Sequence, residues 1–244
     1  MAFAHLSDAF FTKLKSIGSR QNFDPAHALN VMAYESGLDP HIMNRAGAPA
    51  GGIFQKFFVV RGADGKPDKA ASLEAARQFA ALSAEEQLDA YEAYMAPYKS
   101  VPKKGPETLY QLNFMPASAL PGPEFRGLGD DAIVAAKGGT GFRGIEAAAF
   151  AENAQLDVDK DNAITVGDLA KVMATARARI DWNGLMNRLT SAPGTYVPQK
   201  APATIYVAAA PSLVPLLLAA GIFGGTVFLM RKGIIPMVGR ARFA

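Results

Sequence analysis

Cysteine is absent from the 244-residue chain, which excludes disulfides and cysteine-based metal sites and leaves the redox compartment open. Histidine is scarce, and the three present, His5, His27 and His41, are too scattered to suggest a metal triad. No Ser-His-Asp order, P-loop or dinucleotide fingerprint occurs. Half of the residues are hydrophobic, which is enough for a core of ordinary size. A catalytic site in this chain would therefore use side chains other than cysteine, a histidine cluster or a Ser-His-Asp triad.

Acidic residues are missing from residues 182–244, which contain six basic residues, whereas the preceding 181 residues hold 19 basic and 22 acidic ones. The net charge of +3 therefore originates in the C-terminal segment. Basic and aromatic residues do not alternate as they do in nucleic-acid-binding surfaces. We expect no specific nucleic-acid partner.

Charge is also missing from residues 201–230. Within this run, residues 212–230 would extend about 28 Å as a helix, close to the thickness of the hydrocarbon core of a bilayer. We therefore predict a transmembrane helix over residues 205–230, with the lipid bilayer as a partner. Gly221 and Gly225 form a small-xxx-small face, which makes a homo-oligomer through these glycines one possible arrangement.

The rest of the chain predicts a mainly α fold, with helices joined by loops rich in glycine and proline, and residues 53–60 as the best strand candidate. Asp24 and Pro25 are a typical helix start and Gly37 a typical stop, and Ser83 with Glu86 predicts a capping box. We divide the chain into six parts. The first three are an amphipathic helix unlike a secretory signal (1–21), a helical domain (22–144) and a small acidic unit (145–185). A linker (186–204), the transmembrane helix (205–230) and a basic tail (231–244) follow.

Glu35 is the candidate catalytic residue. It shares one face of the predicted helix with Ala28, Val31 and Met32, so its carboxyl group stands at the end of an apolar stripe. Partial desolvation there would raise its pKa, as a general acid for a glycosidic oxygen requires. Spacing alone leaves a solvated glutamate at a helix end as the alternative.

The residues that follow favour the catalytic interpretation. Glu35-Ser36-Gly37 with Pro40, and then Gly51-Gly52-Ile53-Phe54-Gln55, resemble the signature E-S-x-x-x-P and G-A-x-G-x-x-Q of the lytic transglycosylase, or soluble-lysozyme-like, family. Residues 82–98 and 109–116 are similar to two further segments of its phage-type members. The Tyr-Asn-x-Gly motif of cellular members is missing.

This resemblance implies a lysozyme-like helical domain with glycine-rich loops that cleaves the MurNAc-GlcNAc β-1,4 bond of peptidoglycan glycan strands. It implies that Glu35 protonates the leaving oxygen and then removes the proton of the C6 hydroxyl, which yields a 1,6-anhydro product. Ser36 would orient Glu35, and Gln55 and the Gly52 backbone would line the cleft. In place of the missing motif we expect a substrate-binding tyrosine beside the sugar, Tyr94 or Tyr110, although both are also typical core residues.

A lysozyme-type hydrolase is the close alternative, with Asp39 or Asp64 as the second carboxylate that activates water. Asp39 stands beside a proline, and Asp64 lies in the sequence Gly-Ala-Asp-Gly-Lys. Both contexts are typical of turns.

Residues 157–168 follow the pattern of an EF-hand calcium loop, so we predict a small EF-hand-like appendage. Asn162 replaces the usual glycine at position 6, which requires a left-handed backbone that asparagine tolerates. Position 12 holds an aspartate, as in dockerin-type loops, and Ile164 is the apolar anchor. The alternative is a solvated turn that caps the next helix. The predicted ligands of a structural Ca²⁺ are Asp157, Asp159, Asp161, the Ala163 carbonyl and Asp168.

Together these features predict a membrane-anchored phage virion transglycosylase that opens the cell wall for genome entry, located in the virion and, during entry, in the host envelope. Its further partners would be other virion proteins. Two alternatives stay open. One is a non-catalytic structural or channel-forming virion membrane protein with a glycan-binding lysozyme-like domain. The other is an envelope transglycosylase of a bacterial secretion system.

Overall fold

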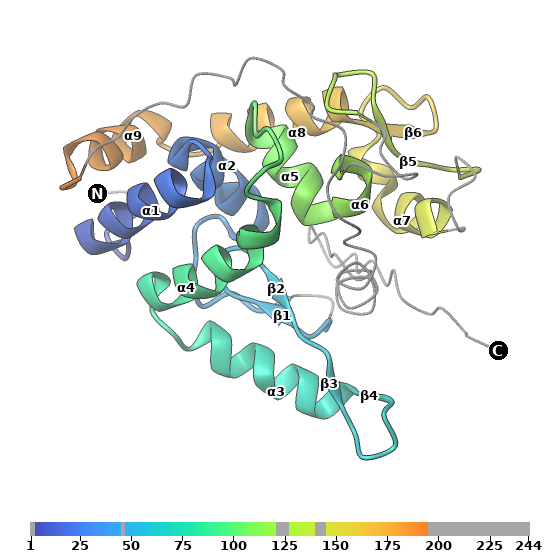
Figure 1. Ribbon diagram of the computed structural model, residues 1–244, viewed down its shortest axis with the longest axis horizontal. Helices are drawn as coiled ribbons and strands as arrows, with labels where there is room; N and C mark the ends of the chain where they lie inside the picture. The colour runs from blue at the N-terminus through green and yellow to red at the C-terminus, as the bar shows by residue number, and fades with distance from the viewer. Residues whose placement is uncertain (1–2, 45–46, 121–126, 140–144, 195–244) are drawn as a thin grey trace.

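The computed structural model describes residues 3–44, 47–120, 127–139 and 145–194, and this part of the chain is mainly helical, as predicted (Figure 1). Among the residues described, no helix combines the length and the apolar character that crossing a bilayer requires. The predicted transmembrane helix at 205–230, its Gly221 and Gly225 face and the basic tail lie outside the described residues.

Helix α2 begins and ends at the capping residues that the sequence predicts, whereas the predicted helix over residues 1–21 begins only at Asp8. Helix α1 (Asp8–Gln21) is capped by the Ser7 hydroxyl, which accepts a hydrogen bond from the Phe10 N–H at 3.1 Å. Helix α2 (Pro25–Ser36) is capped by Asp24 and ends at Gly37, whose left-handed backbone (φ 66°) returns its N–H to the last carbonyls of the helix.

Four further helical segments follow: α3 (Lys69–Ala80), α4 (Ala84–Met95), α5 (Pro106–Phe114) and the short α6 (Pro116–Ala119). The predicted capping box of Ser83 and Glu86 opens α4. A single 3-10 turn, η1 (Ala96–Tyr98), continues α4 past Met95.

The strands are short and form three antiparallel pairs in the described regions: β1 (Ala50–Gly51) with β2 (Lys56–Phe57), β3 (Val60–Arg61) with β4 (Pro67–Asp68), and β5 (Ile133–Ala136) with β6 (Ala163–Thr165). The strand candidate at 53–60 is not one continuous strand: residues 53–55 form a tight turn after Gly52, residues 56–57 are β2, and residue 60 begins β3. Sequence analysis missed β5, since its pairing partner β6 is remote in sequence.

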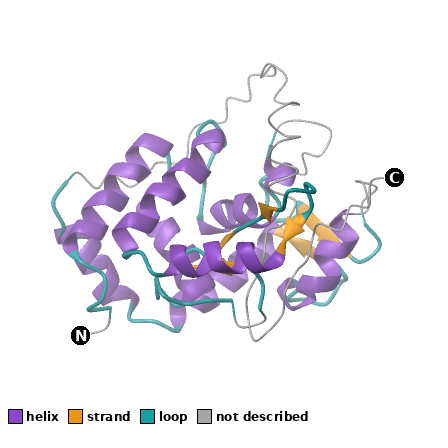
Figure 2. Cartoon of the chain, turned by 90° about the horizontal axis from the view of Figure 1, so that it is seen from below, coloured by secondary structure: helices purple, strands orange, loops and turns teal. Residues whose placement is uncertain are grey.

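The predicted acidic unit is a helix–loop–helix: α7 (Ile145–Asn153) and the 3-10 turn η2 (Ala154–Leu156) precede the loop, and β6 and α8 (Val166–Ala178) follow it. Helix α8 packs against α2 and α5, and its Leu169 and Met173 belong to the same hydrophobic core as those helices. In Figure 1, α5 and α8 lie between the group of α1, α4 and α9 and the group of α7, β5 and β6. Figure 2, viewed from below, shows that the short strands lie among the helices.

Helix α9 (Trp182–Ser191) extends beyond residue 186, where we predicted a linker to begin. Two contacts explain the difference. Leu185 and Leu189 are buried, and α9 packs on α1. The buried amine of Lys15 lies 3.2 Å from the Thr190 carbonyl oxygen and 2.5 Å from that of Ala192, so it satisfies carbonyls at the end of α9.

Candidate active site

Glu35 lies in the last turn of α2 with only 4% of its surface exposed. The residues predicted to share its face, Ala28, Val31 and Met32, are all buried in the core. The predicted apolar face of α2 is therefore present. The Glu35 carboxyl group at its end is almost fully buried, whereas the sequence predicted only partial desolvation.

Burial raises the pKa of Glu35 well above its usual value of 4.5. The Asn113 amide opposes this shift by donating a hydrogen bond of 2.7 Å to Oε1. Glu35 is thus held as the neutral acid at a higher pH than an exposed glutamate.

The two oxygens of Glu35 differ. Oε1 accepts the hydrogen bond from Asn113, whereas Oε2 has no hydrogen-bond partner among the described residues. An amide nitrogen can only donate, so the acid proton belongs on Oε2. That proton is not committed to another protein group and can be transferred to a ligand.

Asn113 is a site residue that sequence analysis missed. It lies on α5, one helical turn after Tyr110, and α5 packs directly against α2. The sequence comparison with phage-type transglycosylases covered residues 109–116, but it did not predict a contact between Asn113 and Glu35. Only the packing of α5 on α2 assigns one.

Tyr94 and Tyr110 both border Glu35. Burial raises the pKa of each phenol well above 10, and the charge of Glu35 contributes in the same direction. Tyr110 is completely buried, and its ring packs edge-on against Tyr34 at 5.2 Å. Tyr94 is only partly buried, and its hydroxyl donates to the Leu112 carbonyl at 2.8 Å. Of the two, Tyr94 alone keeps some exposed surface, whereas Tyr110 belongs to the core, so contact with a ligand stays a prediction for Tyr94.

Ser36 connects α2 to the glycine turn. Its hydroxyl lies 2.6 Å from the Ile53 carbonyl oxygen and 2.9 Å from that of Met32, and it shares its single hydrogen between them. The structure describes no hydrogen bond from Ser36 to the Glu35 carboxyl group. Ser36 therefore orients Glu35 only indirectly, by holding the turn against the end of α2.

The turn itself depends on Gly52, which adopts φ +83°, and on a second residue that we did not predict. The buried side chain of Gln87 accepts a hydrogen bond from the Ile53 N–H at 2.7 Å and donates to the Pro40 carbonyl at 2.7 Å. Gln87 lies in α4, within the segment 82–98 that the sequence analysis compared with phage-type transglycosylases. That comparison did not predict that its side chain would hold the glycine turn.

Gln55 also has a left-handed backbone (φ 52°) and a buried side chain. Its amide nitrogen lies 3.1 Å from the Gly52 carbonyl oxygen and 3.3 Å from that of Ile42, so its donors are used within the turn. Its Oε1 has no partner in the described part of the chain. Gln55 can therefore offer a ligand an acceptor, for example for a sugar hydroxyl.

Both candidates for a second carboxylate lie in exposed turns. Asp39 accepts a hydrogen bond of 2.8 Å from the His41 N–H. Asp64 accepts one of 3.0 Å from the Lys66 N–H at the tip of the β3–β4 hairpin. In each case the side chain accepts a hydrogen bond from the backbone two residues later, which is an Asx turn.

In the acidic loop, carboxylate oxygens of Asp157, Asp159 and Asp161 lie within 4.8 Å of one another and could hold a metal ion. The Asp157 carboxylate accepts hydrogen bonds from the Asp161 and Asn162 N–H groups at 3.2 and 3.1 Å. Asn162 has the left-handed backbone that we expected (φ 73°), and Ile164 is completely buried as the apolar anchor. Ala163 begins β6, and its N–H donates to Asp161 at 2.8 Å.

Asp168, the fifth predicted ligand, stands outside this cluster. It forms a capping box with Thr165 at the start of α8, and its Oδ2 accepts from the Thr165 N–H and hydroxyl at 3.1 and 2.7 Å. Its Oδ1 lies 3.3 Å from the Val158 nitrogen and 3.4 Å from Lys171 Nζ. These contacts agree with the capping alternative, and a ligand role for Asp168 stays a prediction.

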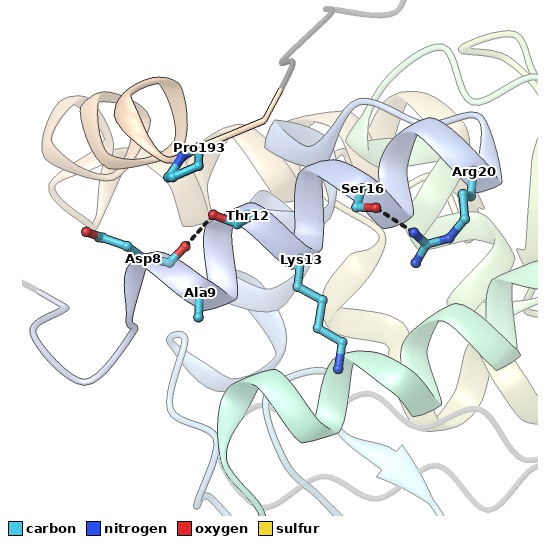
Figure 3. A pocket seen from close by; sticks show the side chains of 7 residues that line it. All are labelled: Asp8, Ala9, Thr12, Lys13, Ser16, Arg20 and Pro193. Carbon is cyan, nitrogen blue, oxygen red and sulfur yellow. Dashed lines mark hydrogen bonds between the residues drawn. The ribbon is translucent and has the colours of Figure 1, made fainter.

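The surface also has a shallow depression of about 570 Å³ on the outer face of α1 (Figure 3). It is lined by Asp8, Ala9, Thr12, Lys13, Ser16, Arg20 and Pro193. Neither Glu35 nor any other predicted site residue lines it, so it has no part in the chemistry considered above.

The raised pKa of Glu35 makes stability depend on pH. The folded state keeps this proton above pH 4.5, where the unfolded chain loses it, so the free energy of unfolding falls as pH rises towards the folded pKa. The expected slope from this group is about 1.4 kcal/mol per pH unit. Urea denaturation at a series of pH values should show this loss in the wild type and lack it in Glu35→Gln. Parallel pH profiles for the two proteins would contradict the assignment.

Comparison of the chain with protein-family models, with curated proteins and with solved structures gave no match.

Proposed function

We propose that the protein is a peptidoglycan lytic transglycosylase and that Glu35 is its acid and base. The observation that supports this proposal most directly is a buried carboxyl group of raised pKa, with one oxygen held by Asn113 and the other without a partner in the described regions. The turn of Gly52 and Gln55 beside the end of α2 supplies the second half of the family-like arrangement.

The proposed reaction uses Glu35 twice. Its Oε2 proton goes to the glycosidic oxygen as the bond to the MurNAc C1 breaks, and Glu35 becomes a carboxylate. The desolvated carboxylate is a strong base, so it then takes the proton of the C6 hydroxyl while that oxygen bonds to C1. The product is a 1,6-anhydro sugar, and Glu35 is again protonated.

Asn113 would contribute to both steps. Its amide donates to Oε1, and this bond strengthens when Glu35 becomes charged. It therefore stabilises the carboxylate that forms after the first proton transfer. Because Glu35 is only 4% exposed, the glycan has to displace covering groups before it reaches Oε2.

The transglycosylase route is preferred over hydrolysis because Asp39 and Asp64 are exposed and bind backbone N–H groups within their own turns. A hydrolase needs a second carboxylate that faces the same bond and activates water. Mass spectrometry of the products from purified sacculi would test this choice. Anhydro ends support the transglycosylase, reducing ends support the hydrolase, and an absence of products would favour the non-catalytic alternative.

We further propose that the acidic loop binds Ca²⁺ as a structural ion through Asp157, Asp159 and Asp161. Three carboxylates so close together repel one another without a cation, and oxygen ligands suit a hard cation. Lys171 Nζ, at 3.4 Å from Asp159, offsets part of this repulsion. The virion and membrane locations remain proposals that rest on the uncharged run at 201–230.

Calcium should therefore raise thermal stability. At a concentration about 100 times its Kd, a ligand of the folded state contributes about 2.7 kcal/mol, which corresponds to an increase in Tm of roughly 5–10 °C. Asp159→Asn should remove most of this increase, and Asp131→Asn, which changes an exposed acid outside the loop, should keep it. Differential scanning fluorimetry with calcium and with a chelator would measure the effect, and equal Tm values in both would refute calcium binding.

A further inference from the structure

A second, smaller depression lies between the end of α2 and α8, next to the acidic loop. Its volume is about 180 Å³, which is more than a carboxylate group occupies. None of its lining residues is acidic: Tyr34, Gln155, Val158, Lys171, Val172, Thr175, Ala176 and Arg179.

The positive charges of this depression come from one row of α8. Lys171, Thr175 and Arg179 are spaced four residues apart, so they follow one another on a single helical face. The Arg179 guanidinium forms no ion pair within the described residues. Lys171 forms only long contacts of 3.4 Å to Asp159 and Asp168. Arg179 is therefore the cation available to an anion that enters the depression, and Lys171, which also contacts Asp159 and Asp168, adds positive charge beside it.

A buried donor in the same lining has no acceptor. The Gln155 side-chain nitrogen is buried and makes no hydrogen bond to any described residue. Leaving a buried donor unpaired costs about 1–3 kcal/mol, so such a group calls for an explanation. An acceptor oxygen of a bound ligand would provide the missing bond.

Tyr34 connects this depression to the candidate active site. It precedes Glu35 in the chain and lines the depression, and its ring packs edge-on against Tyr110 at 5.2 Å. Tyr110 in turn borders Glu35. The depression and the candidate active site are therefore linked through adjacent residues of α2 and through Tyr110.

We propose that this depression binds a carboxylate of the peptide attached to the glycan strand. This inference rests on the proposed function, since the peptide-bearing strand is the substrate of that reaction. Arg179 would pair with the carboxylate, with Lys171 adding charge and the Gln155 amide donating the third contact. The depression would then favour glycan strands that carry peptides over bare strands.

Direct binding tests the site without catalysis. Isothermal titration of the full chain with the dipeptide L-Ala-γ-D-Glu should give a Kd that increases about tenfold in Arg179→Gln, the loss expected for one charged hydrogen bond. Arg177→Gln is the matched control, because Arg177 lies on the same helix but stacks over the Trp182 ring at 5.8 Å and does not line the depression. An unchanged Kd in Arg179→Gln, or an equal loss in both variants, overturns the proposal.

Kinetics separates this inference from the proposed function. On peptide-bearing strands Arg179→Gln should raise KM about tenfold with kcat unchanged, and on strands freed of peptide by an amidase it should change neither. If the wild type binds the dipeptide but cleaves neither substrate, the carboxylate site stands and the proposed function fails. If it cleaves both equally well, the carboxylate site is refuted and the proposed function stands.

Discussion

Glu35→Gln should abolish glycan cleavage, with a decrease in kcat of at least about 10³-fold, because general acid and base steps each contribute roughly 10²–10⁴-fold. Glutamine has the size of glutamate and can keep the Asn113 contact through its carbonyl oxygen. It has no proton for the leaving oxygen and cannot accept one from the C6 hydroxyl. The variant should therefore remain folded and bind glycan while failing in chemistry.

Glu107→Gln is the matched control. Burial also raises the pKa of Glu107, but this residue lies in the first turn of α5 and makes no contact with Glu35 that the structure describes. We expect it to cleave at the wild-type rate. Release of soluble muropeptides from sacculi measures all three proteins, and circular dichroism checks their folding. Equal release by wild type and Glu35→Gln would reject Glu35 as the catalytic residue.

Asn113→Ala should release muropeptides at a rate between those of Glu35→Gln and Glu107→Gln. It removes the donor to Oε1, and since that donor lowers the pKa of Glu35, the pKa should rise further. The carboxylate formed after the first proton transfer would lose a charge-assisted hydrogen bond, so kcat should fall by roughly tenfold or more. The alkaline limb of the pH–rate profile should move to higher pH. A merely structural role for Asn113 would leave that limb in place.

Gly52→Ala should have the largest effect on stability, with an expected loss of about 3 kcal/mol in the free energy of unfolding. A Cβ at this position would lie 2.5 Å from the Phe79 ring and 2.6 Å from Oε1 of the Gln87 side chain, so the turn would have to move. The backbone φ of +83° adds a conformational cost for any residue other than glycine. Displacing Gln87 would also leave the Ile53 N–H without its acceptor.

Gly37→Ala separates these contributions. Gly37 has a similar left-handed backbone (φ +66°), but nothing lies within 4 Å of the Cβ it would gain. This variant should lose only the conformational part, about 1 kcal/mol. Urea denaturation of both variants gives the difference, which measures crowding of the turn. Equal losses would show that the contacts of Gly52 with Phe79 and Gln87 are unimportant.

Local features of the fold were predictable because their causes lie within a few residues. Asp24 and Gly37 bound α2, and Ser83 with Glu86 opens α4, since each cap satisfies backbone groups of its own helix. The left-handed backbone of Asn162 follows from its place in the loop pattern. In contrast, β5 lies in a glycine-rich segment without strand-like alternation and forms because β6, about 30 residues away, pairs with it.

The sequence by itself determined that a helix ends just after Glu35 and that a glycine turn follows, because capping and turn formation are local. Only the tertiary structure decided that the Glu35 carboxyl group is buried and has a raised pKa. Its pKa depends on desolvation by remote segments, and its contact with Asn113 joins residues 78 positions apart. Ser36 and Gln87 likewise hold the turn through contacts that no local pattern specifies. A residue's identity fixes which protons it can exchange, but its surroundings in the fold set the pH at which it does so.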